Sequence, residues 1–409
     1  MSAARRPRLF DGVGVEVEFM IVDARSLDVL PIADELLERA GEPDGGPAAW
    51  SNELAMHLVE IKTVGPMASL AESARLIGDE ARRFNHLLRP RGARLMPTAA
   101  HPWMDPATET LLWPYEFGEV YRAYDRVFDC RTHGYANLQS VHVNLPFEGD
   151  AEFGALMAAA RLVVPLIPAL AASSPIYGLA RHEWLDGRLA MYLANSGPVP
   201  SITGALIPEP IYTEEEYRER VLEPMLRDMA PFDQEEVLRG EWLNARAAIA
   251  RFDRGAVEIR VVDTQERPRA DMAVAAAIAI AIRAVAEERW IGYETQRAWD
   301  TQRLRAVMLE TARYAETAVI TDRDYLRAFG ASGASPLTAG ALWEHVLNDT
   351  RAVYPFEQEL EEPLEIILRH GSLASRILRG VGGHLDKEGV FRVYRRLCDC
   401  LERDEPYLP

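Results

Sequence analysis

Short runs in which apolar and polar residues alternate constrain the fold of this 409-residue chain more than any other feature. In residues 13–22, Val15 and Val17 alternate with Glu16 and Glu18. A period of two predicts a strand, because successive side chains then point to opposite faces of a sheet. Both glutamates therefore share one face, where like charges repel each other unless something offsets them. A bound cation or a solvated outer face would each meet that requirement.

A second apolar run, residues 54–64, carries Glu60 and Lys62 on one face and is preceded by Glu53. Glu53 and Glu60 are an odd number of positions apart, so a regular strand would place them on opposite faces. Either Glu53 precedes the strand, or a bulge brings it to the face of Glu60. Taken alone, Glu60 and Lys62 also fit an exposed ion pair.

Two further segments repeat the alternating pattern. Residues 138–145 place His142 on a polar face, together with a serine and an asparagine. Residues 256–263 place Glu258 and Arg260 on one face, and the Asp-Arg-Gly turn before them predicts a hairpin with the preceding apolar run. Structural alternatives exist here too, because a histidine can be satisfied within a core and a glutamate–arginine pair can lie at the surface.

The remaining segments favour helices and loops. Ser69 is a candidate N-cap for a helix to about Leu88, and Pro268 is well placed in the first turn of a helix to about Trp290. Helices are also predicted over 151–172, over 214–229, and from 300 onward with breaks at Pro336, Pro355 and Pro363. A long loop with a helix inside it is predicted over 97–134. An ordered loop region is predicted over 173–210.

Strands thus cluster in about the first 265 residues and helices in about the last 140, without a helix after every strand. This order predicts an α+β fold in which helices pack on the outer side of a largely antiparallel sheet. We expect a single catalytic domain over residues 1–409. Its sheet-forming core would span about 10–290, and a helical part at about 300–409 would cover the sheet.

Charge and composition exclude several kinds of partner. The chain has 45 basic and 63 acidic residues, and this net charge of −18 argues against nucleic acid or an anionic membrane as the main partner. Lys62 and Lys387 are the only lysines, and the absence of a G-x-x-x-x-G-K-[ST] motif excludes a P-loop. No apolar run is long enough to span a bilayer. Three cysteines predict a reducing, cytoplasmic location rather than a disulfide framework.

If the four strands share one sheet, their polar faces gather one set of charged side chains. The set comprises Glu16, Glu18, Glu53, Glu60, Glu258, His142, Lys62 and Arg260. Oxygen-rich ligands with at most one nitrogen suit Mg²⁺ or Mn²⁺ rather than Zn²⁺. Two or three such ions would offset the carboxylates and hold a nucleotide triphosphate, with Arg260 on the transferred phosphoryl group.

The order and spacing of these motifs resemble the glutamate–cysteine ligases of the second type, which are carboxylate–amine ligases of the glutamine synthetase superfamily. The resemblance covers most of residues 10–290. It rests on Gly14, Glu16 and Glu18 as G-x-E-x-E, on Glu60-Ile61-Lys62-Thr63 preceded by Glu53, on His101-Pro102, on Val141-His142-Val143, and on Val257-Glu258-Ile259-Arg260-Val261-Val262-Asp263.

The resemblance implies an antiparallel sheet curved around a funnel that holds ATP and two or three Mg²⁺ or Mn²⁺ ions. The implied metal ligands are Glu16, Glu18, Glu53, Glu60, His142 and Glu258. Arg260 and Glu60 would be catalytic, and Arg260, Lys62 and Glu258 would contact the nucleotide. The implied reaction phosphorylates a substrate carboxylate. An amine then displaces phosphate from the acyl phosphate to form an amide.

Departures from the family pattern fall where the substrates are expected to bind. The family's H-V-H-V is Ser140-Val141-His142-Val143 here, so the first histidine is missing. The family's S-S-P-[FY]-W is Ser173-Ser174-Pro175-Ile176-Tyr177, and the S-x-R that follows it in the family has no clear match. The reaction class is therefore better supported than the substrates.

Four arginines are candidates for binding a substrate carboxylate. Arg181 or Arg188 could replace the missing arginine of S-x-R, and Arg246 and Arg251 lead into the strand of Glu258. An exposed structural role explains Arg246 and Arg251 at least as well. The expected substrates are small amino acids, glutamate and cysteine being the family's pair, or the end of a peptide.

Three functions stay open from the sequence. The first is an ATP-dependent ligase for glutamate and cysteine or for another acid and amine. The second is a phosphotransferase of the guanidino kinase type, which would need one acceptor. The third is a protein that binds nucleotide or metal without turnover, which the complete carboxylate set disfavours. A homo-oligomer is compatible with all three.

Overall fold

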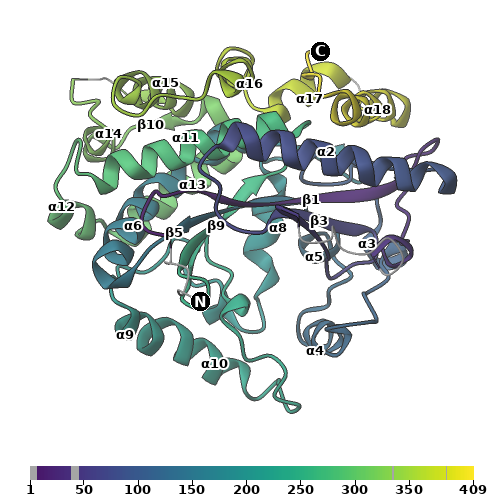
Figure 1. Cartoon of the computed structure of the whole chain (residues 1–409), viewed down its shortest axis with the longest axis horizontal. Helices are drawn as coiled ribbons and strands as arrows, with labels where there is room; N and C mark the ends of the chain where they lie inside the picture. The colour runs from purple at the N-terminus through teal and green to yellow at the C-terminus, as the bar shows by residue number, and fades with distance from the viewer. Residues whose placement is uncertain (1–6, 38–45, 334–335, 384) are drawn as a thin grey trace.

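A central sheet organises the computed structural model, which describes residues 7–37, 46–333, 336–383 and 385–409 (Figure 1). The strand order is β2-β3-β1-β5-β9-β8, with β4 also paired to β1, and every pairing is antiparallel. The strands are β1 Gly14–Asp23, β2 Ala48–Asn52, β3 Leu58–Thr63, β4 Ala93–Met96, β5 Ser140–Pro146, β8 Ala248–Arg251 and β9 Ala256–Asp263. The predicted α+β class with an antiparallel sheet is confirmed.

Helices cover the face of the sheet to which the alternating valines point. Figure 1 shows α2 (Leu70–Leu88) and α11 (Pro268–Ala286) above the sheet, and α11 also contacts α6 (Gly149–Val163) and β5. Because strand side chains alternate, the glutamates of β1 point away from these helices. The strand residues beneath the helices are at most 1% exposed: Val15, Val17, Phe19, Val141, Val143, Val257, Ile259 and Val261.

Helix starts follow the predicted capping signals. Ser69 Oγ accepts a hydrogen bond of 3.1 Å from the backbone N–H of Glu72, as the N-cap of α2. Pro268 is the first residue of α11, where a missing N–H costs nothing. That helix ends at Ala286, earlier than the predicted end near Trp290.

Prolines and a π-helical segment divide two of the predicted helices. Residues 151–172 form α6, a 3₁₀ turn Val164–Leu166 and α7 Pro168–Ala171, because neither Pro165 nor Pro168 can donate a backbone hydrogen bond. Residues 214–229 form α9 Glu214–Tyr217, a π-helical turn Arg218–Leu222 and α10 Glu223–Met229.

Several predictions about the first half of the chain were incomplete. The run 54–64 is not one strand, because β3 begins only at Leu58 and Glu53 lies between β2 and β3. Neither β2 nor β4 was predicted. The helix predicted within 97–134 is α4 Gly118–Phe128. The predicted loop regions also contain α3 Pro106–Glu109, α5 His133–Ala136, β6 Ile176–Tyr177, β7 Ala180–Arg181, α8 Gly187–Asn195 and a 3₁₀ turn Pro200–Ile202.

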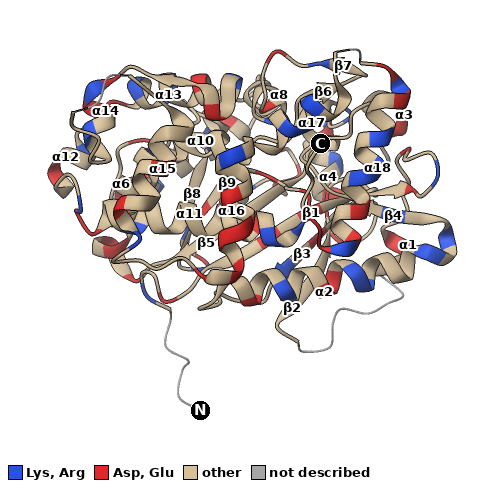
Figure 2. Cartoon of the chain, turned by 90° about the horizontal axis from the view of Figure 1, so that it is seen from above, with Lys and Arg blue, Asp and Glu red and all other residues tan. Residues whose placement is uncertain are grey.

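The helices from residue 339 onward lie on the same side of the sheet as α11 and α2 (Figure 1). Seen from above, both acidic and basic residues occur along the ribbons of these helices (Figure 2). The predicted break at Pro363 is wrong, because this proline lies inside α16 (Gln358–His370) and the helix continues to His370 despite the missing N–H of this residue.

The remaining elements complete the chain. They are α1 Asp34–Leu37, 3₁₀ turns Arg89–Arg91, Glu241–Leu243 and Ala315–Thr317, α12 Tyr293–Arg297, α13 Thr301–Tyr314, β10 Val319–Ile320, α14 Arg323–Ala328, β11 Leu337–Thr338, α15 Ala339–Thr350, α17 Leu373–Val381 and α18 Lys387–Arg403. Within the described ranges, no helix combines the length and apolar character needed to cross a membrane.

A buried ion pair joins the end of the sheet to the C-terminal helices. Arg376 of α17 pairs with Glu266, just after β9, at 2.7 Å, and the two side chains are 0% and 2% exposed. Arg376 also donates to the carbonyl oxygen of Tyr407 at 2.8 Å. Burial alone would raise the pKa of Glu266, but the charge of Arg376 and its hydrogen bond overcome this and lower the pKa.

Replacing Glu266 by glutamine should strongly destabilise the protein. The substitution leaves the Arg376 guanidinium buried without its counter-charge, which typically costs about 3–5 kcal/mol in the free energy of unfolding. Urea denaturation measures the loss. Glu365→Gln, in an exposed pair with Arg369 at 3.3 Å, is the matched control and should change stability by less than about 1 kcal/mol. Equal effects of the two variants would contradict this account.

Candidate active site

The polar faces of four strands meet on the side of the sheet opposite α2 and α11. In the register of the strands, Glu16 lies opposite Lys62 on β3 and opposite His142 on β5. Glu18 lies opposite Glu60. These side chains line a cavity of about 660 Å³, which also receives Glu53, Glu258 and Arg260. Figure 1 shows α4 and α10 on this side of the sheet.

The carboxylates form two groups that could each hold a cation. Glu16, Glu60 and His142 offer ligand atoms that all lie within 4.8 Å of one another, and so do Glu18, Glu53 and Glu60. Glu60 belongs to both groups. Oxygen-rich ligands with a single nitrogen are the set that Mg²⁺ or Mn²⁺ prefers, so the side chains fit the expected metal.

The electrostatics of Glu53 and Glu60 indicate a deficit of positive charge. Burial raises the pKa of Glu53 well above its usual value, and the charges of Glu18 and Glu60 raise it further. Burial, then the charge of Glu16, raises the pKa of Glu60 to about 7 despite the nearby Lys62 ammonium. A divalent cation would relieve both penalties, because it stabilises the ionised carboxylates.

Cationic side chains offset part of the charge. Lys62 Nζ pairs with Glu60 Oε1 at 2.7 Å and donates to Ser51 Oγ at 3.0 Å. Arg254 Nη1 pairs with Glu16 Oε1 at 3.1 Å. Burial would raise the pKa of Glu16, but its hydrogen bond with His142 and that residue's charge reverse the direction and lower it.

Ser140 occupies the position where the family pattern has a histidine. Its backbone N–H donates to Glu18 Oε2 at 2.7 Å, and its Oγ donates to the same oxygen at 3.1 Å. The hydroxyl also lies 3.1 Å from His142 Nε2. The serine therefore orients Glu18 and contacts the remaining imidazole, and it contributes no nitrogen ligand.

Glu258 lines the cavity but belongs to neither of the two carboxylate groups found among the described residues. Its oxygens face Arg251 Nη1 at 3.1 Å and Arg260 Nε at 3.4 Å. Arg260 Nη1 also donates to the carbonyl oxygen of Asn244 at 3.0 Å. Burial would lower the pKa of Arg260, but Tyr192 and Glu258 raise it, so the guanidinium stays charged.

The four candidate substrate arginines occupy different surroundings. Arg188 lines the cavity and pairs with Asp263 at 2.5 Å, while its buried Nη2 has no hydrogen-bond partner. Arg251 lines the cavity but is engaged by Glu258. Arg246 is 3% exposed and ion-paired with Glu209 at 2.6 Å. Arg181 is exposed on β7, and neither it nor Arg246 lines the cavity.

Some cavity residues were not anticipated from the sequence. Ser51 comes from the unpredicted strand β2, and Arg254 lies in the predicted hairpin turn. The aromatic residues of 97–134 were noted, but their position over the cavity was not. Tyr121 and Tyr124 on α4 line it, together with Trp242 from the 3₁₀ turn before β8. Aromatic enrichment was the only sequence signal for the two tyrosines, and no sequence signal marked Trp242.

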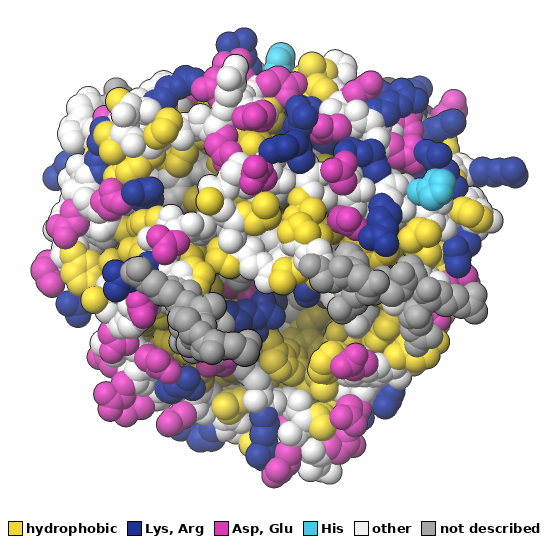
Figure 3. Space-filling view, in the orientation of Figure 1, with side chains coloured by type: hydrophobic (Ala, Val, Ile, Leu, Met, Phe, Trp, Pro, Cys, Tyr) yellow, Lys and Arg dark blue, Asp and Glu magenta, His cyan; other side chains and the backbone are white. Residues whose placement is uncertain are grey.

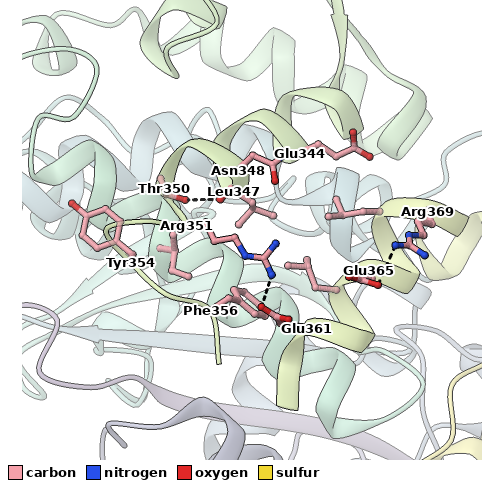
Figure 4. Close-up of a pocket in the computed structure, with 13 residues that line it drawn as sticks. Glu344, Leu347, Asn348, Thr350, Arg351, Tyr354, Phe356, Glu361, Glu365 and Arg369 are labelled. Carbon is pink, nitrogen blue, oxygen red and sulfur yellow. Dashed lines mark hydrogen bonds and ion pairs between the residues drawn. The ribbon is translucent and has the colours of Figure 1, made fainter. Parts of the chain in front are cut away.

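Two other cavities differ from this one. A cavity of about 470 Å³ adjoins it and shares Glu16, Lys62 and Arg254. In Figure 3, Lys and Arg side chains lie in a hollow near the centre of the face, beside hydrophobic side chains. A cavity of about 300 Å³ lies remotely among α11, α15 and α16 (Figure 4). There Arg351 pairs with Glu361 and Arg369 with Glu365, so both of its arginines are already engaged by carboxylates.

A family model for the glutamate-cysteine ligase family 2 (GCS2) matches residues 12–396 of the chain. The chain belongs to glutamate-cysteine ligase family 2. The resemblance seen in the motifs is thereby confirmed, and it extends through the helical C-terminal part. The family and the fold support a ligase-like enzyme.

Several relatives are similar to this chain. An uncharacterized protein of Archaeoglobus fulgidus is 29% identical over 404 residues, covering 97% of this chain and 100% of that protein. A candidate glutamate–cysteine ligase 2-3 of Rubrobacter xylanophilus is 33% identical over 178 residues, covering 44% of this chain and 46% of that protein. A candidate glutamate–cysteine ligase 2 of Leifsonia xyli is 30% identical over 44% of this chain and 46% of that protein.

A solved structure shares the fold. The glutamate–cysteine ligase of Francisella tularensis, in complex with AMP, matches with a TM-score of 0.61 over 97% of this chain and 90% of that chain. The two sequences are 13% identical. At this identity the similarity establishes the architecture, and the reaction has to be argued from the site.

Mg²⁺ should bind more tightly as the pH rises from about 6 to about 8. The pKa of Glu60 is raised to about 7 without metal, so below that pH a proton must leave before the carboxylate can bind an ion. The affinity should fall by about tenfold per pH unit below 7 if one proton is displaced. Isothermal titration calorimetry in two buffers of different ionisation enthalpy measures both the affinity and the released proton.

Glu60→Gln is the control, because its amide cannot titrate. This variant should bind Mg²⁺ weakly and with less dependence on pH. A wild-type affinity that does not change between about pH 6 and 8 would contradict the coupling between the proton and the metal.

Proposed function

We propose that the protein is an ATP-dependent carboxylate–amine ligase that forms an amide through an acyl phosphate. The observation that carries the proposal is the arrangement of two carboxylate groups sharing Glu60, with Lys62 and Arg260 beside them, in one cavity of a chain from a ligase family. Polyanionic substrates held by divalent cations need this combination of acidic ligands and basic side chains.

The carboxylate groups account for two ion positions. Glu16, Glu60 and His142 would hold one Mg²⁺ or Mn²⁺, and Glu18, Glu53 and Glu60 the other. Bound ions would offset the negative charge that develops on the phosphate oxygens. Glu258 would act mainly by orienting Arg260, which it faces at 3.4 Å. A third ion has no comparable group among the described residues.

The basic side chains divide the work around the transferred phosphoryl group. Arg260 presents a guanidinium fixed by Glu258 and by the carbonyl oxygen of Asn244, so it needs little rearrangement to bind a phosphoryl oxygen. Lys62 and Arg254 line both the main cavity and its neighbour. We propose that these two contact the nucleotide phosphates, while the small residues of the second cavity, such as Gly14 and Gly65, leave space for the remainder of the nucleotide.

Arg188 is our candidate for binding the acid substrate. Asp263 holds its Nε, whereas Nη2 has no partner. A buried donor without a partner is costly, and a substrate carboxylate would supply the missing acceptor. Because the other carboxylate of a diacid would be phosphorylated near Arg260, the pair Arg188 and Arg260 favours an acid with two carboxylates, glutamate being the family's example.

The reaction then proceeds in two steps. A carboxylate oxygen of the acid attacks the terminal phosphorus of ATP, and ADP leaves. The nitrogen of the amine next attacks the acyl carbon, the carbon–oxygen bond to phosphate breaks, and the nitrogen loses a proton.

We propose that residues 1–409 act as one catalytic domain. We also propose that the reaction takes place in the cytoplasm, where thiols stay reduced. The three cysteines of the chain are free and buried.

ADP release should require Mg²⁺, ATP and two organic substrates. We expect glutamate plus an amino-acid amine to support release, measured with a coupled ADP assay and confirmed by mass spectrometry of the amide. Glu258→Gln should lower kcat by at least about a hundredfold, because Arg260 loses the carboxylate that orients it. Glu359→Gln, an exposed substitution on α16, should leave activity unchanged.

The stoichiometry separates the alternatives. Release with one acceptor and a phosphorylated product would identify a phosphotransferase. Binding of Mg²⁺-ATP without release, for every acid and amine tested, would identify a binding protein. Either result would reject the ligase.

Arg188→Lys should raise KM for the acid while leaving KM for ATP within about twofold. Lysine keeps a positive charge beside Asp263 but loses the second, planar donor that would reach a substrate carboxylate. Arg181→Gln is the control, because Arg181 lies outside the cavity lining. Thermal denaturation of both variants checks folding. An unchanged acid KM in a folded Arg188→Lys variant would remove Arg188 from the substrate site.

A further inference from the structure

One wall of the active-site cavity has no part in the reaction described above. It is formed by α4, by the 3₁₀ turn Glu241–Leu243 and by the segment before that turn. The side chains of this apolar wall are Phe117, Val120, Tyr121, Tyr124, Val237 and Trp242. Phe117 is 59% exposed and Trp242 is 39% exposed. Large apolar side chains that line a cavity and remain accessible mark a surface for an apolar ligand group.

The backbone of Phe117 supports a ligand-binding role. Its φ is +63°, in the left-handed region, where it serves as the N-cap of α4 without a capping side chain. Bulky residues avoid this conformation, whereas glycine and asparagine adopt it readily. Burial of the ring does not compensate for the strain, since more than half of the side chain is exposed. The exposed ring lines the cavity and is therefore available for contact with a ligand.

Trp242 is held in place although it is exposed. Its indole lies against Gly240, where an added Cβ would come within 2.0 Å of the indole Nε1. Its ring centroid is 6.1 Å from that of Tyr124. The carbonyl oxygen of Trp242 also accepts from Arg260 Nη1 at 3.5 Å. The turn that presents the indole to the cavity therefore also contacts the arginine assigned to the phosphoryl group.

The proposed reaction leaves one substrate for this wall. The phosphates are assigned to the carboxylate groups with Lys62 and Arg254, and the nucleotide extends into the second cavity. The acid, polar at both ends, is assigned to Arg188 and Arg260. The amine is the remaining component. The wall of α4 and the 3₁₀ turn that is left for it is apolar and aromatic, and Asn52, Asn195 and Ser196 line the cavity beside it. A small polar side chain would leave most of this wall in contact with water.

We propose that the apolar wall binds the amine substrate and selects amines with a large apolar side chain, aromatic ones in particular. The inference rests on the ligase activity proposed above and specifies its amine. Aromatic rings would pack against Trp242 and Phe117 with favourable edge or offset geometry, beyond the area that they bury.

The test is an amine panel with glutamate as the acid: cysteine, alanine, leucine, phenylalanine and tryptophan. We expect kcat/KM for phenylalanine or tryptophan to exceed that for cysteine by at least about tenfold. Trp242→Ala should remove this preference by raising KM for the aromatic amines, and Trp242→Phe should restore part of it. Phe117→Asn should weaken the same amines without loss of thermal stability, because asparagine tolerates the positive φ.

Leu111→Asn is the matched control. Leu111 is 53% exposed on the segment before α4 but does not line the cavity, so its substitution should change no KM. If the wild type uses cysteine with the same kcat/KM as the aromatic amines, the inference is overturned, but the proposed ligase activity stands. If Trp242→Ala raises KM for ATP by the same factor with every amine, the apolar wall belongs to the nucleotide site. This result would also overturn the inference. ADP release with no pair at all would instead reject the ligase, and the inference with it.

Discussion

Repulsion among glutamates that share one face of a sheet is the constraint on which the other features of the site depend. Neighbouring strands lie about 4.7–4.9 Å apart, so Glu18 and Glu60, opposite each other on β1 and β3, cannot both be buried and ionised without a counter-charge. The helices of the other face fix the sheet and prevent the strands from separating. The negative charge must therefore be offset within the cavity. The raised pKa values of Glu53 and Glu60 indicate that the positive charge of Lys62 alone does not offset it.

The sequence predicted the parts of the site that depend on alternation within a strand. Glu16 and Glu18 were placed on one face because they are two positions apart, and Glu258 and Arg260 for the same reason. The α+β class followed from the order of strands and helices. These predictions hold because the period of a strand is a local property, which a single chain shows without knowledge of its neighbours.

Features that depend on the pairing of distant segments were not predicted. The strand β2, which supplies Ser51, is short, and no alternating run in the sequence marks it. The proximity of Arg254 to Glu16 arises because a hairpin turn reaches across β5, which the residue pattern of the hairpin does not encode. Likewise, nothing periodic places Trp242 or α4 over the sheet. Pro363 was misread for a different reason, because a proline removes only one backbone hydrogen bond and the packing of α16 on α11 lets the helix continue through it.

The scarcity of lysine gives the Lys62–Glu60 pair a practical consequence. Lys62 shares the chain with one other lysine, Lys387, so amine-acylating reagents have two side-chain targets in 409 residues. Burial lowers the pKa of Lys62, but the charge of Glu60 and its hydrogen bond raise it above the usual value, which keeps the amine protonated and slow to react. Any ligand that binds Glu60 and breaks its ion pair with Lys62 changes the nucleophilicity of the Lys62 amine. The acylation rate of this one amine thus reports, by mass spectrometry, how the carboxylates are occupied.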